Sequence, residues 1–314
     1  MGFDELQSLL ARHTRPDTTT AIDGLYIARV ERSEPPAPEM SGTVLAVLAQ
    51  GAKRLAVGEQ VHEYGPGRIL VASVDLPVTG HFVGASSRYP ALGFALTLEP
   101  SAIADLLLDL GSADLPRSRP GAVPGIAVGD LTPELLDASL RLLRLLDHRR
   151  DQAALVPLVK KEILWRLISG AQGGAVRQLG LADSGLSHIA RAVRWIREHY
   201  AEPFRVEDLA ALTGMSASAF YRNFQVATAQ SPIQFQKQIR LQQARLLLAA
   251  DPHDITTIAH RVGYDSLSQF SREYRRRYGV PPSRDAASLH RLGSRVTSSG
   301  VPASTPRRAV RGRP

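Results

Sequence analysis

The sequence predicts an α+β chain, in which a β-rich N-terminal part precedes a helical hairpin and an all-helical C-terminal part. Three observations lead to this prediction. Short β-rich runs separated by turn residues follow one another from Gly24 to about Leu98, and the apolar period becomes helical from Glu99 onward. A helical pattern in the last third of the chain occurs twice, at a spacing of 49–50 residues. A length of 314 residues allows two domains.

The composition excludes several classes of protein. With 44% hydrophobic and 22% charged residues, the chain is not disordered throughout. No apolar run reaches the roughly 18 residues that a membrane-spanning helix needs, and the first residues lack the basic start and apolar core of a secretory signal. The chain has no cysteine, which excludes disulfides, thiolate metal sites and cysteine nucleophiles, and predicts a reducing, cytoplasmic environment.

The net charge of +8 is distributed unevenly. Residues 1–183 carry 18 Lys and Arg against 21 Asp and Glu, whereas residues 184–283 carry 13 against eight. Residues 284–314 carry seven Arg against one Asp and have no apolar periodicity, so we expect a disordered, Arg-rich tail there. Such an asymmetry indicates a polyanionic partner or, equally, a solubilising surface.

The N-terminal part is expected to begin with an arm over residues 1–20, which contains a turn or two of amphipathic helix. From residue 21 to about residue 100, short strands alternate with Gly, Pro, Ser and Asp clusters at a spacing of roughly 8–12 residues, which predicts a β-sandwich or barrel. The expected strands lie in GLYIARV, TVLAVLA, KRLAVG, QVHEY, RILVAS, TGHFVG and ALGFALTL.

Helices follow this β-rich part. Pro100 suits the first turn of one helix, and a loop rich in Pro and Gly is expected to run from there to about Gly129. Thr132 and Pro133 then have the residue types of an N-cap and a first helical position, and open a hairpin of two amphipathic helices over residues 131–170. Its apolar stripe can pack on the β-domain or pair with a second copy of the chain. The Gly-rich segment 171–186 is the best candidate for a linker, which would close an N-terminal domain over residues 21–180.

The segment 187–283 contains two short helices joined by a turn, followed by a second copy of the same pattern. In the first copy, Gly214 suits a positive φ and Ser216 suits an N-cap, so VEDLAAL and the helix after Ser216 form a helix-turn-helix. Ile258, Ala259 and Gly263 stand 49 positions after their counterparts, and Phe270, Arg272 and Tyr274 stand 50 positions after theirs. The second turn is therefore one residue longer than the first. One long helix, N-capped by Ser231 with Pro232 at its first position, connects the copies.

The second helix of each copy has one apolar and one polar side. With Phe220 and Phe224 inward, the polar residues lie on the opposite side, where they can reach base edges in a major groove; Arg is the bidentate partner of guanine. An ordinary solvated face is the alternative, but its repetition in the basic third of the chain favours DNA reading. The candidate DNA-binding residues are Ser218, Tyr221, Arg222, Gln225, Ser268, Gln269, Ser271, Arg272 and Arg275.

At these residues the sequence resembles the AraC/XylS family of bacterial transcription regulators. The strongest resemblance runs from Ile258 through Val262-Gly263-Tyr264 and Phe270-Ser271-Arg272 to Gly279-Val280-Pro281-Pro282-Ser283. It implies an AraC-type double helix-turn-helix domain over residues 187–283, whose two units enter successive major grooves of promoter or operator DNA. The sequence departs from the family at Ala229, where Gly is usual, and at Phe235-Gln236, where an aromatic residue followed by Arg is usual.

The N-terminal part resembles the AraC-type regulatory domain, a cupin-like β-barrel followed by a helical hairpin. The matching residues are Gln50-Gly51-Ala52-Lys53, Gly67-Arg68 and residues 73–78. This resemblance implies a domain that senses a small-molecule effector of unknown identity and forms a homodimer, in a cytoplasmic activator that contacts DNA and RNA polymerase and no membrane.

Two other functions are compatible with parts of this sequence. A cupin-like barrel can hold a metal with two His one residue apart and a nearby Glu, but His62 and His81 stand alone, with only Glu63 beside the first. No Ser-His-Asp order, phosphate-binding Gly loop or HExxH motif is present either, so we expect no enzyme, no catalytic residue, no cofactor and no metal. The other alternative is an architectural protein that binds DNA through charge alone, without reading bases.

Overall fold

The computed structural model describes residues 2–110, 122–182, 184–251 and 254–297, with only the backbone for residues 290–297. The chain divides into two compact units, Met1–Arg240 and Leu241–Pro314. The first unit is α+β and the second is helical, as the sequence predicts. None of the described helices is both long and apolar enough to cross a bilayer.

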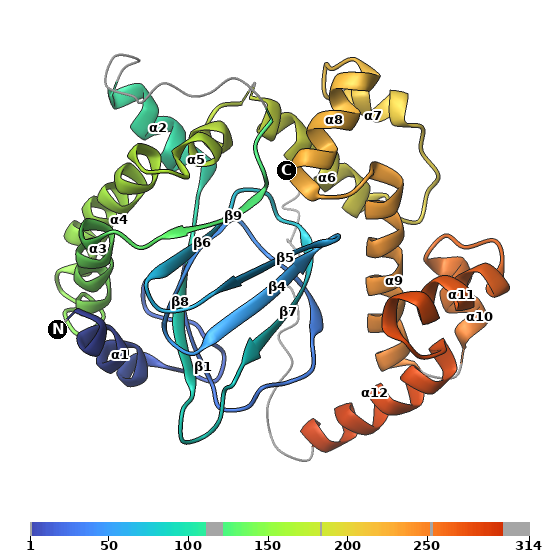
Figure 1. Ribbon diagram of the computed structural model, residues 1–314, viewed down its shortest axis with the longest axis horizontal. Coiled ribbons are helices and arrows are strands. Elements are labelled where there is room, and N and C mark those ends of the chain that lie inside the picture. Colours follow the sequence, from blue (N-terminus) through green and yellow to red (C-terminus); the bar gives the residue numbers. More distant parts are fainter. Residues whose placement is uncertain (1, 111–121, 183, 252–253, 298–314) are drawn as a thin grey trace, which may run out of the picture. The chain divides into compact units, whose positions relative to one another are not determined.

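The strands of the first unit form two antiparallel sheets (Figure 1). One sheet has the order β1-β8-β3-β6-β9 and the other the order β2-β7-β4-β5. Their bounds are β1 Leu25–Val30, β2 Ala37–Met40, β3 Val44–Gln50, β4 Ala52–Val57, β5 Gln60–Tyr64, β6 Arg68–Ala72, β7 Pro77–Val83, β8 Ala91–Thr97 and β9 Ile126–Asp130.

Two strands lie where the sequence predicts irregular chain. Strand β2 falls within SEPPAPEMSG, residues 33–42, one of the clusters expected to form turns, and it tolerates Pro38 because it is an edge strand that pairs with β7. Strand β9 replaces the end of the loop expected up to Gly129, and it pairs with β6 from Ile126 to Asp130. Tertiary pairing therefore extends both sheets beyond what local composition indicates.

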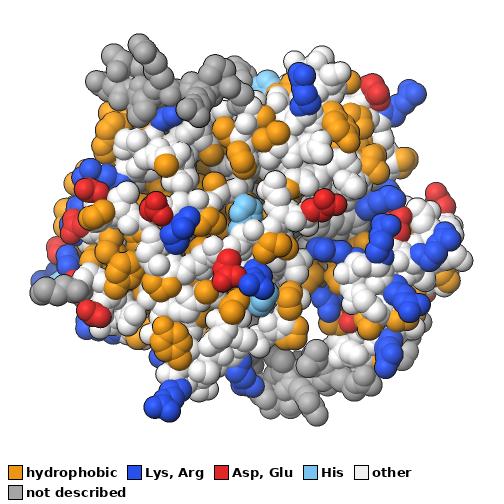
Figure 2. Space-filling view, viewed as in Figure 1, with side chains coloured by type: hydrophobic (Ala, Val, Ile, Leu, Met, Phe, Trp, Pro, Cys, Tyr) orange, Lys and Arg blue, Asp and Glu red, His pale blue; other side chains and the backbone are white. Residues whose placement is uncertain are grey.

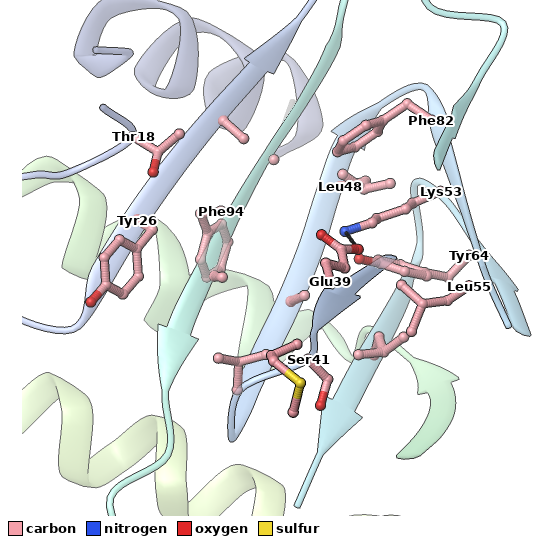
Figure 3. A pocket seen from close by; sticks show the side chains of 17 residues that line it. Thr18, Tyr26, Glu39, Ser41, Leu48, Lys53, Leu55, Tyr64, Phe82 and Phe94 are labelled. Atoms are coloured by element: carbon pink, nitrogen blue, oxygen red, sulfur yellow. Dashed lines mark ion pairs between the residues drawn. The ribbon is translucent and has the colours of Figure 1, made fainter. Parts of the chain in front are cut away.

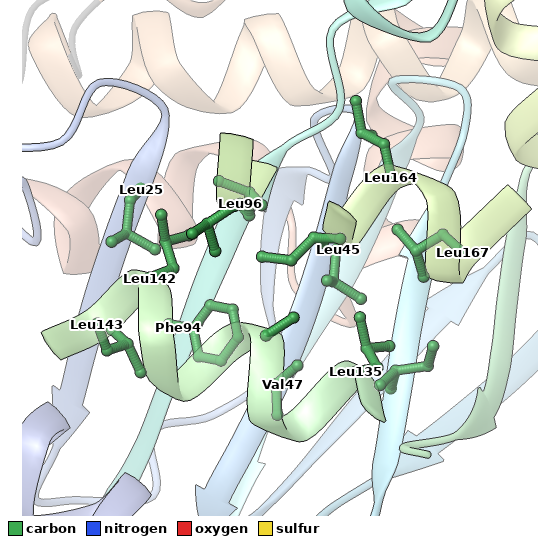
Figure 4. Packing of buried hydrophobic residues seen from close by; sticks show 14 of the residues in the cluster. Leu25, Leu45, Val47, Phe94, Leu96, Leu135, Leu142, Leu143, Leu164 and Leu167 are labelled. Carbon is green, nitrogen blue, oxygen red and sulfur yellow. The ribbon is translucent and has the colours of Figure 1, made fainter. Parts of the chain in front are cut away.

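Three helices cover the outer face of the five-stranded sheet: α1 (Gly2–His13), α3 (Pro133–Arg144) and α4 (Gln152–Ser169). Alternate residues of β3 and β8, such as Leu45 and Phe94, point towards the leucines of α3 and α4 (Figure 4). The hairpin and its cap are confirmed, because Thr132 Oγ1 accepts a hydrogen bond from the Leu135 amide at 3.2 Å. The expected N-terminal arm is a helix of 12 residues whose Leu6, Leu9 and Leu10 are buried.

The expected linker at 171–186 is wrong as a flexible segment. Helix α5 (Gly173–Gly180) occupies its centre, and α5 packs against α2 (Pro100–Leu110) through the buried Val176 and Leu179. A side chain at Gly173 would collide with the Ile168 carbonyl, and one at Gly180 would collide with Ile103. These glycines permit close packing, which composition cannot distinguish from chain flexibility.

The remaining helices are α6 (Gly185–Glu198), α7 (Val206–Leu212), α8 (Ala217–Thr228), α9 (Pro232–Ala250), α10 (Ile255–Arg261), α11 (Leu267–Tyr278) and α12 (Pro282–Thr297). Helix α12 corrects the expectation of a disordered tail from residue 284, since Pro282, Asp285 and Ala286 are buried and anchor its first turn. The rest of the expected tail, residues 298–314, lies outside the described residues.

The first helix-turn-helix shares a hydrophobic core with the four-stranded sheet. Ile189 and Phe224 belong to the same buried cluster as Leu55 and Val78. Polar contacts join the helices to segments beside the strands: Arg197 of α6 pairs with Asp75, between β6 and β7, and the Gly125 amide, just before β9, donates to the Ala227 carbonyl of α8 at 2.9 Å. Helices α6–α8 are therefore packed as part of the first unit.

Candidate nucleic-acid interface

The turn between α7 and α8 has the geometry that the sequence predicts. Gly214 has a φ of +68°, and the next amide, that of Met215, donates to the Ala210 carbonyl at 2.9 Å. Thr213 is buried, and its hydroxyl donates to the carbonyls of α7. Ser216 then caps α8 by accepting from the Ala219 amide at 3.3 Å.

The turn between α10 and α11 repeats this geometry. Gly263 has a φ of +87°, and the Tyr264 amide donates to the Ala259 carbonyl at 3.0 Å. Ser266 caps α11 by accepting from the Gln269 amide at 3.3 Å. Tyr264 corresponds to Met215 at an offset of 49 residues, and Ser266 corresponds to Ser216 at an offset of 50. The extra residue of the second turn is therefore Asp265.

Paired aromatic rings fix the orientation of each second helix. Phe220 and Phe224 of α8 are fully buried, with ring centroids 5.5 Å apart, and Phe270 and Tyr274 of α11 repeat the pair at 5.5 Å. Residues spaced by four lie on one side of a helix, so these rings turn the intervening polar side chains outward. The repeat found in the sequence is thus a repeat of packing.

The four candidates on α8 are all exposed and share one side of the helix. Tyr221 is 43% exposed, and Arg222 forms no ion pair with any described residue. A free guanidinium between hydroxyl and amide groups can donate to two acceptors of one base. The α8 group consists of Ser218, Tyr221, Arg222 and Gln225.

Helix α11 presents its candidates in the same way, with two differences. Ser271 is half-buried, whereas the α8 candidates are all exposed. The Gln269 side-chain amide donates to the Glu273 carboxylate at 3.3 Å. Glu273 also accepts from the Tyr264 hydroxyl at 2.8 Å, so a carboxylate that the sequence analysis overlooked orients one candidate. The remaining candidates Ser268, Arg272 and Arg275 are exposed. The α8 and α11 groups belong to different compact units.

Positive charge surrounds the α11 group. Arg275, Arg276 and Arg277 form the last turn of the helix, where they also complement the negative end of its dipole. On the face drawn in Figure 2, Lys and Arg side chains are frequent over the helices of the second unit. A phosphate backbone is the polyanion that such a surface suits.

A buried polar network stabilises the second helix-turn-helix where the first has an aromatic contact. Phe224 meets Phe235 edge-on at 5.5 Å, whereas its counterpart Tyr274 donates its hydroxyl to Asp285 at 2.8 Å. Asp285 also pairs with Arg245 at 2.9 Å. Burial and the hydrogen bond to Asp285 raise the pKa of Tyr274. The offset of 50 residues relates Phe235 to Asp285, which indicates that the repeat continues into α12.

Within the described residues, no group of three His, Asp or Glu side chains is arranged to hold a metal ion. His62 and His81 lie on strands β5 and β7, and burial lowers the pKa of His62. A lowered His pKa accompanies desolvation and needs no metal.

Comparison with known proteins agrees with this geometry. Residues 21–175 match the AraC-type transcriptional regulator N-terminus, and residues 209–287 match a helix-turn-helix domain family. Among curated proteins, the chain is similar to the HTH-type transcriptional regulator ExsA of Pseudomonas aeruginosa, with 29% identity over 52% of this chain and 58% of ExsA. It is also similar to a probable thc operon regulatory protein of Rhodococcus erythropolis, with 32% identity over 64% of this chain and 63% of that protein. The chain thus spans less than two thirds of the length of these two relatives.

Longer but weaker similarity is found elsewhere. The virulence regulon transcriptional activator VirF of Yersinia enterocolitica is 25% identical over 78% of this chain and 89% of VirF. Among solved structures, ToxT from Vibrio cholerae O395 aligns with 84% of this chain and 97% of its own, at 10% identity and a TM-score of 0.46. Together, the two family matches, the repeated helix-turn-helix and the named relatives show that the chain belongs to the AraC family of DNA-binding transcriptional regulators.

Proposed function

We propose that the protein is a sequence-specific regulator that reads promoter or operator DNA with α8 and α11. The observation that carries this proposal is the repeated pair of helices with the same buried aromatic side and the same exposed polar side. Each helix is long enough to lie in a major groove, and each places an arginine at the centre of its exposed side.

The side chains have distinct roles in this proposal. Arg222 and Arg272 each contact a guanine, and Gln225 and Gln269 provide amide groups for adenine. Ser218, Tyr221, Ser268 and Ser271 add hydrogen bonds to bases or phosphates, and Arg275 contacts phosphate.

The experiment compares Arg222→Ala and Arg272→Ala with the matched control Arg149→Ala. Arg149 is an exposed arginine between α3 and α4, so its replacement changes the net charge equally. We expect Arg222→Ala and Arg272→Ala each to lose about 1–3 kcal/mol of binding free energy on the preferred DNA sequence. Each should also relax specificity at the base position that its arginine contacts. The control should bind like the unaltered protein in a DNA-selection assay at one stated salt concentration.

The same assay separates base reading from binding through charge alone. A charge-only protein would show equal weakening on every sequence and no specificity ratio between the preferred site and random DNA. Uniform weakening by both recognition variants would therefore contradict the proposed roles of Arg222 and Arg272.

The finer parts of the proposal concern the N-terminal domain, residues 21–180. It senses a small-molecule effector and forms a homodimer, which acts as an activator with RNA polymerase in the cytoplasm, where promoter DNA lies.

Helix α4 is the proposed dimer interface. The proposal is supported by Leu155 and Leu158, which are 43% and 63% exposed and, at a spacing of three residues, lie on the same side of the helix. Sedimentation of Leu158→Glu tests it: a dimer of the unaltered protein should dissociate in the variant, and an unchanged dimer would exclude this face.

A further inference from the structure

A cavity of about 200 Å³ lies between the two sheets of the first unit (Figure 3). It exists because the five-stranded sheet has small residues on its inner face. Ala28 is opposite Gly93 and Ala46 is opposite Ala95, whereas the other face of the same strands carries Leu45, Phe94 and similar large side chains. Small side chains on adjacent strands leave a hollow that the opposite sheet does not fill.

The opposite wall carries an ion pair. Lys53 of β4 bonds Glu39 of β2 at 2.7 Å, and its ammonium lies 5.3 Å from the centre of the Phe82 ring. A lysine on the strand side that also carries the buried Leu55 and Val57 is unusual, because that side faces the interior. A side chain at Gly80 would collide with the Glu39 carboxylate, so the glycine leaves room for the pair.

The ion pair lies at one edge of the cavity, which is partly open, since Tyr26 of its wall is 41% exposed. An open cleft on the outer side of the domain is lined by the same Glu39, Lys53 and Phe82. The side chain of Glu39 is 41% exposed and that of Lys53 only 18% exposed. Movement of Glu39 on its short edge strand would therefore connect the cavity with this cleft as well.

Tyr64 supplies a polar group with no apparent structural task. It lies opposite Lys53 on β5, is 95% buried and lines the cavity. Its phenol oxygen forms no hydrogen bond with the part of the chain that the structure describes. Burial, with a smaller contribution from Glu39, raises its pKa, so the phenol is neutral at physiological pH. This oxygen is not sealed from solvent, so water or a ligand in the cavity can form a hydrogen bond with it.

The charges in the cavity limit which ligand it can accept. Lys53 is already neutralised by Glu39, so a carboxylate would bring a second negative charge beside Glu39, and an ammonium would be repelled by Lys53. A buried charge without its own partner is costly. A hydroxyl or amide group, in contrast, can both donate to and accept from Tyr64, Lys53 and Glu39.

The volume limits the size of the ligand. A cavity of about 150 Å³ holds one benzene ring, so this one holds a single ring with a small substituent. Tyr26, Tyr64 and Phe82 provide aromatic walls. We infer that the effector site of the N-terminal domain is this cavity, and that its ligand is a small, uncharged, mainly apolar molecule, such as an aromatic alcohol, held by Tyr64 and the Lys53–Glu39 pair.

This inference rests on the effector-sensing part of the proposed function, and three probes of equal size test it: benzyl alcohol, benzoate and benzylammonium. Calorimetric titration of the full chain should give a dissociation constant for benzyl alcohol at least about tenfold lower than for either charged probe. Tyr64→Phe should raise the dissociation constant of benzyl alcohol about fivefold and leave the shape of the cavity intact. Tyr89→Phe is the matched control, since Tyr89 is 55% exposed and does not line the cavity, and it should bind like the unaltered chain.

A second variant tests the place of binding. Ala46→Leu fills the hollow and should abolish binding of benzyl alcohol, and circular dichroism checks that the variant folds. If Ala46→Leu misfolds, Ala28→Leu fills the same space from β1. Tighter binding of benzoate, unchanged binding by a folded filled variant, or no binding of any probe would each overturn the inference. None of these results bears on DNA reading, which is measured with unliganded protein.

Discussion

Ala229 shows how one residue type can conflict with the backbone it must adopt. It ends α8 with a φ of 58°, and its counterpart 50 residues later is Gly279, with a φ of 75°. The helix end needs a left-handed residue in both repeats, and an alanine there is strained because of its Cβ. The departure from the usual family glycine therefore affects stability at a defined position, while the Gln230–Ser231–Pro232 start of α9 still forms.

Ala229→Gly is expected to stabilise the protein. The substitution removes about 1–2 kcal/mol of backbone strain from the folded state. This gain is larger than the free-energy cost of about 0.4–1 kcal/mol that arises because glycine gives the unfolded chain more conformational entropy. Urea unfolding should show a net gain of roughly 0.5–1 kcal/mol. The control is Ala211→Gly, at an exposed position inside the right-handed helix α7, and its free energy of unfolding should fall by about 1 kcal/mol instead. A loss at both positions would contradict the strain argument.

Asp285 is the residue on which the buried network of the second unit depends. Asp285→Ala leaves the Tyr274 hydroxyl and the Arg245 guanidinium without their carboxylate, so we expect a loss of about 2 kcal/mol. Hydrogen exchange of the α10 and α11 amides in the full chain measures this loss. Asp265→Ala removes an exposed carboxylate of the same unit and should leave exchange almost unchanged.

At the scale of elements, α11 combines an exposed basic side with two tyrosines in contact, of which Tyr274 is buried and Tyr278 half-buried. The rings of Tyr274 and Tyr278 are tilted against each other with centroids 4.6 Å apart, and the Arg245 guanidinium lies over the Tyr278 ring, 4.8 Å from its centre. Burial raises the pKa of Tyr278 to about 12. The helix that presents Arg272 and Arg275 is thus held by phenols that must stay neutral.

This arrangement predicts a loss of stability at alkaline pH. The folded pKa of Tyr278 exceeds its unfolded value of about 10, so its contribution is complete below pH 10 and is lost as the pH rises towards 12. Tyr278→Phe should be no less stable at pH 7, since no described residue bonds the buried hydroxyl. Between pH 10 and 11 its melting temperature, followed by circular dichroism, should fall less than that of the unaltered chain. Parallel decreases would exclude Tyr278 as the titrating group.

At the scale of the whole molecule, the two helix-turn-helix copies have different neighbours. The first shares its core with the four-stranded sheet, and the second has its own core around Phe270, Tyr274 and the first turn of α12. Two similar motifs in one chain are therefore stabilised by different parts of the chain.

Hydrogen exchange of the full chain tests this division. Amides of α8 should exchange through the same opening as those of β4 and β7, because separating them exposes a common apolar cluster. Amides of α11 should open independently. Asp75→Ala, which removes the ion pair with Arg197, should lower the protection of α6 and leave α11 unaffected. Equal protection of α8 and α11, changing together in the variant, would show one cooperative DNA-binding domain instead.

The sequence by itself determined the repeated helix-turn-helix, its caps and turns, the insertion in the second turn and the outward side of α8 and α11. These features depend on residues a few positions apart, and the periods of helices and strands report them directly. Only the tertiary structure decided that the glycines of residues 171–186 pack a helix, that β9 joins the first sheet, that Asp285 bonds Tyr274, and that Ala28, Ala46, Gly93 and Ala95 enclose a cavity with Lys53 and Tyr64. The physical reason is that each depends on contacts between residues distant in the chain, and a small or charged residue has the same local pattern whether it lines a cavity, packs a helix or faces water.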